Sequence, residues 1–279
     1  MTTGTTAHEP LLRIEGLTIT APATPRALVG GVDLVVHRGE SVGIVGESGS
    51  GKSLTCRSVL GIVPDGLRVH ADRLTFDGLD LTALGERAWR AVRGRRIGAV
   101  FQDPASYLNP SLTVGRQVAE ALRVASPRPW RAARREAVAL LASLGLHDAA
   151  RVATRFPHEL SGGMLQRVLI ATAIAGGPDL LIADEPTTAL DATVQAEVLD
   201  VLAALQRSRG LALLFVSHDL AVVAQVCERI VVMRGGVIVE TGRTADVLAS
   251  PAHPYTRSLL AAHRAYGLQR RTPEEVARV

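Results

Sequence analysis

The 279-residue sequence has few cysteines, few aromatic residues and no long apolar run. Its two cysteines, Cys56 and Cys227, form no CxxC motif, which excludes a disulfide framework and a cysteine-built metal site. No apolar run approaches the roughly 18–20 residues that span a bilayer. Residues 1–10 lack the apolar segment of a secretory signal. We therefore expect neither a secreted nor a membrane-spanning protein.

Lysine is almost absent as well: 30 of the 31 basic residues are arginine, and Lys52 is the only lysine. The net charge of +4 is too small to indicate a nucleic-acid scaffold. The arginine-rich run at 130–136 is typical of a solvated helix face. Aromatic residues make up only 3% of the chain, so base-stacking surfaces are not expected. We therefore predict no nucleic-acid partner.

The single lysine lies in a glycine-rich loop that is typical of phosphate binding. Residues 46–53 read GESGSGKS and match the pattern GxxxxGKS. The apolar run 41–45 predicts a buried strand before the loop, and residues 54–60 predict a helix after it. In such a loop the backbone N–H groups surround phosphate oxygens, the lysine reaches the β- and γ-phosphates, and the serine binds Mg²⁺. The predicted phosphate-binding residues are Gly46, Glu47, Ser48, Gly49, Ser50, Gly51, Lys52, Ser53 and Leu54.

Polar side chains follow three further apolar runs, each of which predicts a strand. Asp184 and Glu185 follow one run, His218 another and Gln102 the third. Ligands of open α/β sheets bind at the carboxyl ends of parallel strands, so we expect these side chains near the phosphate loop. Adjacent carboxylates allow Asp184 to hold Mg²⁺, together with Ser53 and Gln102, while Glu185 takes a proton from the attacking water. The predicted catalytic residues are Glu185, His218 and Gln102.

Residues 160–167 read LSGGMLQR, which resembles the signature motif of ABC ATPases. The order of the motifs along the chain also matches that superfamily, and the resemblance covers roughly residues 11–260. It implies an α/β fold with a P-loop (RecA-like) ATPase core, an antiparallel β-subdomain and an inserted α-helical subdomain at about 102–160. It further implies ATP hydrolysis with Mg²⁺ as cofactor. We expect a flexible segment at 1–10, an ATPase domain at 11–250 and a C-terminal tail at 251–279.

The signature segment reads as a helix N-terminus, with Ser161 as N-cap. The resemblance implies that two ATPase subunits pair head to tail, so that the signature of one acts on the nucleotide of the other. The second subunit is a sibling chain or a copy of this one. The residues predicted to act on the partner's nucleotide are Leu160, Ser161, Gly162, Gly163 and Gln166, with Asp191 in the neighbouring D-loop.

Three further stretches resemble ATP-binding subunits of peptide and nickel importers: FQDPASYLNP at 101–110, FPHE at 156–159 and HPYT at 253–256. Among these subunits, the chain most resembles the D-type nickel subunit, because it has Leu165 in the signature segment and no cysteine after Cys227. We therefore predict nickel import. The alternatives are dipeptide or oligopeptide import and, as a different class, an ABC ATPase that acts on ribosomes or DNA.

The resemblance also implies partners and a location. Expected partners are two membrane permease subunits, contacted by the segment 103–110, and an external substrate-binding protein. The expected location is the cytoplasmic face of the inner membrane, as a peripheral subunit. Residues 19–25 contain no aromatic side chain to stack on adenine, which is a departure from the family pattern.

Overall fold

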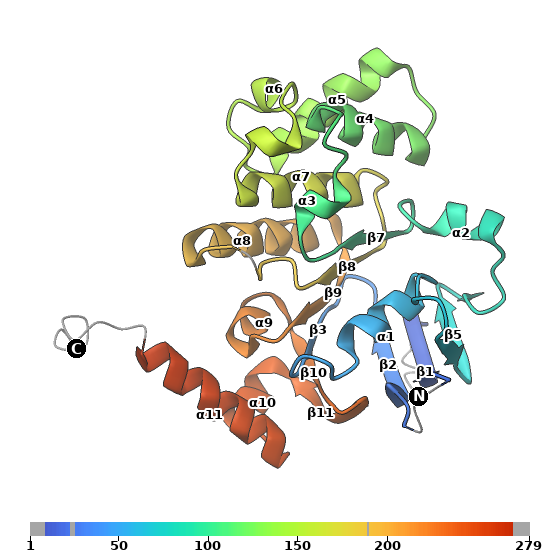
Figure 1. Cartoon of the computed structure of the whole chain (residues 1–279), viewed down its shortest axis with the longest axis vertical. Helices are drawn as coiled ribbons and strands as arrows, with labels where there is room; N and C mark the ends of the chain where they lie inside the picture. Colours follow the sequence, from blue (N-terminus) through green and yellow to red (C-terminus); the bar gives the residue numbers. More distant parts are fainter. Residues whose placement is uncertain (1–8, 23–25, 189, 270–279) are drawn as a thin grey trace, which may run out of the picture.

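The computed structural model describes residues 9–22, 26–188 and 190–269. Most of the expected flexible segment 1–10 and the last ten residues of the expected tail lie outside this range. The described chain is built from two sheets and a set of helices (Figure 1). The predicted α/β fold with an antiparallel subdomain and an inserted helical part is confirmed.

A six-stranded sheet forms the centre of the molecule. Four neighbouring pairs in it are parallel, and β11 pairs with β10 in antiparallel fashion. The strand order is β11 (Val237–Arg243), β10 (Arg229–Arg234), β3 (Ser41–Val45), β9 (Ala212–Ser217), β8 (Leu180–Asp184) and β7 (Ile97–Val100). Strands β3, β8 and β9 are buried throughout, as expected of parallel strands covered on both faces.

The second sheet is antiparallel and lies beside α1 (Figure 1). It consists of β1 (Leu12–Thr20), β2 (Val29–Val36), β4 (Arg68–His70), β5 (Arg73–Phe76) and β6 (Leu79–Asp80). The sequence predicts the β1–β2 pair, because residues 11–38 alternate apolar and polar side chains. Part of the connecting turn, residues 23–25, lies outside the described range.

Helices lie on both faces of the central sheet, and the antiparallel sheet shares one of these faces with α1. They are α1 (Lys52–Val59), α2 (Glu86–Val92), α3 (Pro104–Tyr107), α4 (Val114–Ala125), α5 (Trp130–Ser143), α6 (Ala149–Val152), the 3₁₀ turn η1 (Pro157–Glu159), α7 (Gly162–Ile174), α8 (Ala192–Arg209), α9 (Leu220–Val226), α10 (Thr244–Ala249) and α11 (Pro254–Gln269). The segment 102–160, predicted as a helical insertion, contains α3 to α6. Helices α4 to α6 gather at one end of the molecule, and α10 and α11 lie at the other (Figure 1).

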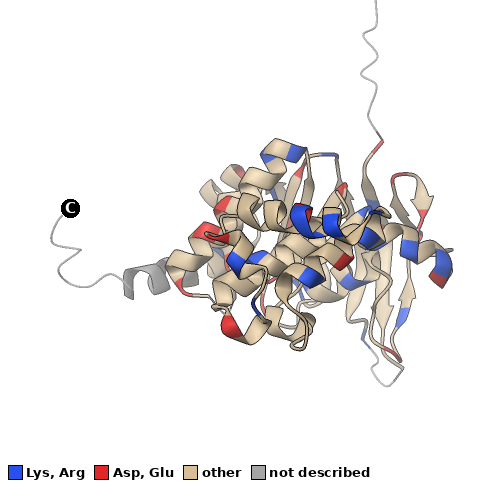
Figure 2. Ribbon diagram, turned by 90° about the horizontal axis from the view of Figure 1, so that it is seen from above, with Lys and Arg blue, Asp and Glu red and all other residues tan. Residues whose placement is uncertain are grey.

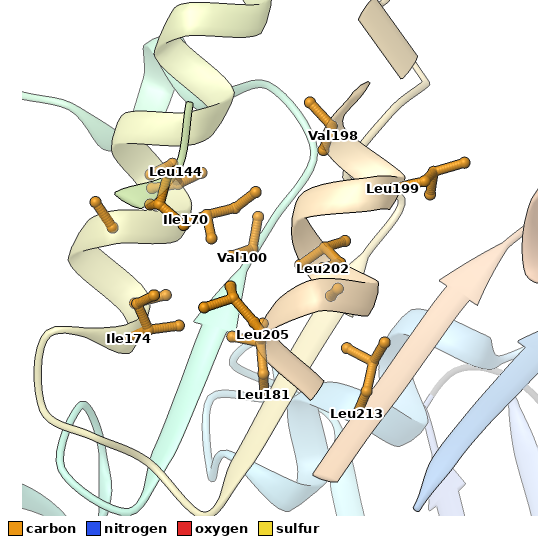
Figure 3. Packing of buried hydrophobic residues seen from close by; sticks show 14 of the residues in the cluster. Val100, Leu144, Ile170, Ile174, Leu181, Val198, Leu199, Leu202, Leu205 and Leu213 are labelled. Carbon is orange, nitrogen blue, oxygen red and sulfur yellow. The ribbon is translucent and has the colours of Figure 1, made fainter. Parts of the chain in front are cut away.

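Two apolar clusters, one on each face of the central sheet, form the core. Side chains alternate between faces along a strand, so Leu181 joins one cluster and its neighbour Ile182 joins the other. Helices α7 and α8 cover the cluster that contains Leu181. Ile170, Leu202 and Leu213 pack in this cluster near β8 (Figure 3). This packing positions the sheet, and with it the loops at the carboxyl ends of its strands.

Basic and acidic residues are interspersed along the ribbon (Figure 2). Within the described ranges, no helix is both long enough and apolar enough to cross a bilayer.

Candidate active site

Four neighbouring parallel strands, β3, β9, β8 and β7, end at one edge of the central sheet. The phosphate loop follows β3, and Glu185 directly follows β8, whose last residue is Asp184. His218 follows β9, and Gln102 comes two residues after β7. The topology therefore brings these predicted site residues to the same edge of the sheet.

The phosphate loop, residues 46–51, depends on glycine at two positions. A Cβ at Gly46 would lie 2.2 Å from the carbonyl oxygen of Met233. Gly51, the N-cap of α1, has φ 98°, a conformation that favours glycine. The loop thus packs against the end of β10 and turns directly into α1, whose N-terminus attracts phosphate.

Lys52 is buried, and its ammonium group closes the loop from inside. Its Nζ donates to the carbonyl oxygens of Gly46 (2.8 Å) and Glu47 (2.9 Å) and lies 3.5 Å from Ser50 Oγ. Burial lowers the pKa of Lys52, although the neighbouring carboxylates of Glu185 and Asp184 act in the opposite direction. A phosphate anion bound in the loop would add further negative charge beside this buried cation.

Ser53 and Asp184 form a pair of adjacent oxygen atoms. The Ser53 hydroxyl donates to Asp184 Oδ1 at 2.9 Å. Asp184 is 5% exposed, and burial raises its pKa above the usual value, against the effect of the Ser53 hydrogen bond. Side-chain oxygens of this kind suit a hard cation such as Mg²⁺, which takes few protein ligands when it also binds phosphate.

Glu185 has φ 49°, which is uncommon for a non-glycine residue. Its Oε2 accepts a hydrogen bond from the Thr188 hydroxyl at 3.0 Å and lies 3.4 Å from His218 Nδ1. The side chain of His218 is 53% exposed. This arrangement keeps one carboxylate oxygen next to an imidazole at the open side of the site, where a water molecule has access.

Gln102 is exposed, and among the described residues its side chain forms no hydrogen bond with the other site residues. It lies between β7 and the short helix α3, whose Tyr107 stacks on Phe101 with ring centroids 5.1 Å apart. Whether its amide reaches the phosphate site therefore stays a prediction.

The signature segment begins α7. Ser161 is the N-cap, with its Oγ accepting from the Met164 N–H at 3.4 Å, and Gly162 is exposed. A Cβ at Gly163 would lie 2.2 Å from Val194 of α8, so this glycine permits close packing of the two helices. Gln166 is 1% exposed. Asp191 caps α8 by accepting from the N–H groups of residues 193 and 194.

Comparison with known proteins identifies the family. A family model described as "ABC transporter" matches residues 29–188. The chain belongs to the ABC transporter family. It is 45% identical over 240 residues to the dipeptide transport ATP-binding protein DppD of Escherichia coli, covering 86% of this chain and 73% of that protein. It is 43% identical over 265 residues to the probable D,D-dipeptide transport ATP-binding protein DdpD of the same organism, covering 94% and 81%.

Among solved structures, the ATP-binding cassette MJ0796, described as dimeric, in a post-hydrolysis state and bound to ADP and Pi, superimposes with a TM-score of 0.73. The two chains are 28% identical, and the match covers 84% of this chain and 98% of the other. The protein is thus an ATP-hydrolysing subunit of an ABC transporter, as its motifs predict. The relatives' names favour peptide import, our alternative, over nickel import.

One contact of this ABC ATPase was missed by sequence reasoning. The hydroxyl of Tyr255, on α11, accepts a hydrogen bond from the backbone N–H of Glu47 in the phosphate loop at 2.9 Å. The two residues are 208 positions apart. Only the HPYT resemblance signals this region, and it does not indicate a contact. Residues 23–25, which are part of the segment 19–25 expected to face adenine, lie outside the described ranges.

Proposed function

We propose that this protein powers the import of dipeptides or other short peptides. The observation that carries the proposal is the 43–45% identity, over most of the chain, to two proteins named for dipeptide transport. The nickel interpretation relied in part on Leu165. Leu165 lies on α7, and its side chain is 9% exposed and packs in the core.

In the proposed reaction, Glu185 accepts a proton from the water that attacks the γ-phosphate. The proximity of His218 to the Glu185 carboxylate supports a role in orienting this water. The phosphate-loop residues and Lys52 hold the β- and γ-phosphates, and the exposed Gln102 is proposed to approach them from its loop.

We propose that Mg²⁺ is held by Ser53 and Asp184, with Gln102 as a further ligand. The adjacent oxygens of Ser53 and Asp184 support this, because Mg²⁺ prefers oxygen ligands. When bound, Mg²⁺ would neutralise negative charge on the phosphates.

We propose that the transporter contains a second ATPase subunit, which pairs with this chain. Leu160, Ser161 and Gly162, with Asp191, are proposed to act on the nucleotide that this partner holds, whereas the predicted Gly163 and Gln166 are buried within this chain. The exposed Ser161 and Gly162 at a helix N-terminus support an anion-binding role, and the MJ0796 cassette is described as dimeric.

We propose that a cytoplasmic helix of one permease subunit docks in an apolar groove beside Gln102. The groove has a volume of about 360 Å³ and is lined by residues that include Ile62, Phe101, Ala121 and Val124. Val124 is 65% exposed. The segment 103–110 borders the groove through the Phe101–Tyr107 stack. Docking there would place the chain at the cytoplasmic face of the inner membrane, and an external binding protein would deliver cargo to the permease from the opposite side.

The test is uptake of a radiolabelled dipeptide by cells that lack this chain. Restoring the wild-type chain should restore uptake, and restoring Glu185→Gln should not. Radiolabelled nickel is measured in the same strains at limiting nickel. If nickel uptake depends on the presence of the chain and dipeptide uptake does not, the proposal of peptide import is wrong and nickel import is the better interpretation.

A further inference from the structure

The peptide group between Gly46 and Glu47 is held from two sides. Its carbonyl oxygen, on Gly46, accepts from Lys52 Nζ at 2.8 Å. Its N–H, on Glu47, donates to the Tyr255 hydroxyl at 2.9 Å. One hydrogen bond comes from inside the loop and the other from the C-terminal helix α11. Tyr255 therefore contacts the same peptide group that positions the phosphate-binding lysine.

This peptide group needs an external partner to fix its orientation. Gly46 has no side chain, so the backbone rotates there more freely than at other residues. A rotation would move the carbonyl oxygen away from Lys52 and turn the ammonium group from its present direction. The Tyr255 hydrogen bond opposes that rotation.

The start of α11 is anchored independently of the phosphate loop. Glu240, on β11, accepts from the N–H groups of Ala252 (2.7 Å) and His253 (3.0 Å). His253 Nδ1 accepts from the Tyr255 N–H at 3.1 Å. These bonds account physically for the HPYT motif, because they fix the turn on which the tyrosine stands.

Arg234 holds the tyrosine ring in place from the other side. Its guanidinium lies 4.8 Å from the centroid of the Tyr255 ring, and its Nε lies 4.0 Å from Glu47 Oε1. Tyr255 is only 9% exposed, and burial raises the pKa of its hydroxyl. The hydroxyl therefore stays neutral at physiological pH and remains a fixed partner of the loop.

We propose that Tyr255 is a positioning residue for ATP binding: its hydroxyl orients the Gly46–Glu47 peptide and, through it, Lys52. ATP affinity then depends on the docking of α11 against the phosphate loop. The proposal goes beyond the proposed function, because it concerns nucleotide binding and does not depend on which cargo is imported.

The test is Tyr255→Phe in the full-length chain, which removes the hydroxyl and keeps the ring under Arg234. ATP binding is measured by displacement of a fluorescent ATP analogue, and turnover is measured in the assembled importer. We expect the Kd and KM for ATP to rise about three- to tenfold, the range of one lost hydrogen bond. The kcat should stay within about twofold, because Glu185 and Asp184 are unchanged.

Ser258→Ala is the matched control. Ser258 stands on the same helix, and its hydroxyl donates to the Pro254 carbonyl oxygen at 3.1 Å, within the helix. This variant should bind ATP like the wild type. Equal Kd values for wild type and Tyr255→Phe would overturn the proposal. A kcat loss at unchanged KM would overturn it as well, and so would an equal affinity loss in both variants. Dipeptide uptake is not a readout here, so failure of the cargo proposal remains distinguishable.

Discussion

Asp184 and Glu185 are neighbours in sequence but differ in environment. Asp184 ends a fully buried strand and accepts from the Ser53 hydroxyl. Glu185 is more exposed, and its φ of 49° turns the chain so that its carboxylate meets Thr188 and His218 instead. The two carboxylates therefore lie in different surroundings, as the proposed division between a metal ligand and a general base requires.

The role of Glu185 is tested by Glu185→Gln. Glutamine keeps an oxygen that can accept from Thr188 but does not take a proton from water. We expect turnover by the assembled importer to fall by about 10²- to 10⁴-fold. ATP affinity should stay within about twofold, because the phosphate loop is unchanged. Glu15→Gln, in the antiparallel sheet, is the control and should hydrolyse ATP normally. Turnover in Glu185→Gln at the wild-type rate would contradict the assignment.

Several elements could be predicted because their determinants are local. The apolar runs of β3, β8 and β9 are followed directly by the residues that form the site, and parallel pairing brings them together. The short strand β4 is exposed throughout, so no apolar pattern indicates it, and its pairing with β1 is long-range. The Tyr255–Glu47 hydrogen bond was unpredictable for the same reason, since only the folded chain brings α11 to the phosphate loop.

The anchor of α11 should depend on pH. Glu240 accepts two backbone hydrogen bonds at the start of this helix. Burial alone would raise the pKa of Glu240, but its hydrogen bonds outweigh that effect and lower the pKa below 4.5. A carboxylate with a lowered pKa stabilises the folded state above the ordinary pKa, and this contribution is lost as pH falls through the lowered value.

We therefore expect Glu240→Gln to melt about 2 °C below the wild type at pH 7, since glutamine offers one acceptor oxygen in place of two. The difference should shrink as pH falls below 4.5, because the wild-type carboxyl then becomes protonated. Thermal melting of both chains across this pH range checks the prediction. A difference that grows on acidification would show that Glu240 does not anchor the helix as a carboxylate.

At the scale of the whole molecule, the apolar groove and the ATPase site are joined by a single loop. Phe101 lines the groove, and the next residue is Gln102. A helix that docks in the groove would press on the loop that carries a predicted catalytic side chain. Docking and hydrolysis are thereby proposed to be coupled through β7.

Val124→Asp tests this coupling. The charge should prevent docking of an apolar permease helix, so dipeptide uptake should fall by about tenfold or more, given that burying an unpaired carboxylate costs several kcal/mol. ATP binding by the chain alone should be unchanged, because Val124 lies on α4 and is 65% exposed. Val69→Asp, at another exposed apolar side chain, is the control and should support normal uptake. Normal uptake with Val124→Asp would mean that the permease docks elsewhere.

The proposed pairing of two ATPase subunits predicts that one chain can bind ATP fully and still fail to hydrolyse it. Ser161→Arg places a bulky side chain at the exposed N-terminus of α7, where the partner's nucleotide is proposed to lie. Its own phosphate loop is intact, so the Kd for ATP should be unchanged. Turnover by the assembled importer should fall about 100-fold or more, as when a donor to the reacting phosphate is removed.

Thr154→Arg adds the same charge at an exposed site in the helical part and should leave turnover unchanged. If Ser161→Arg weakened ATP binding by the isolated chain, the signature would act on its own nucleotide and the head-to-tail arrangement would be wrong.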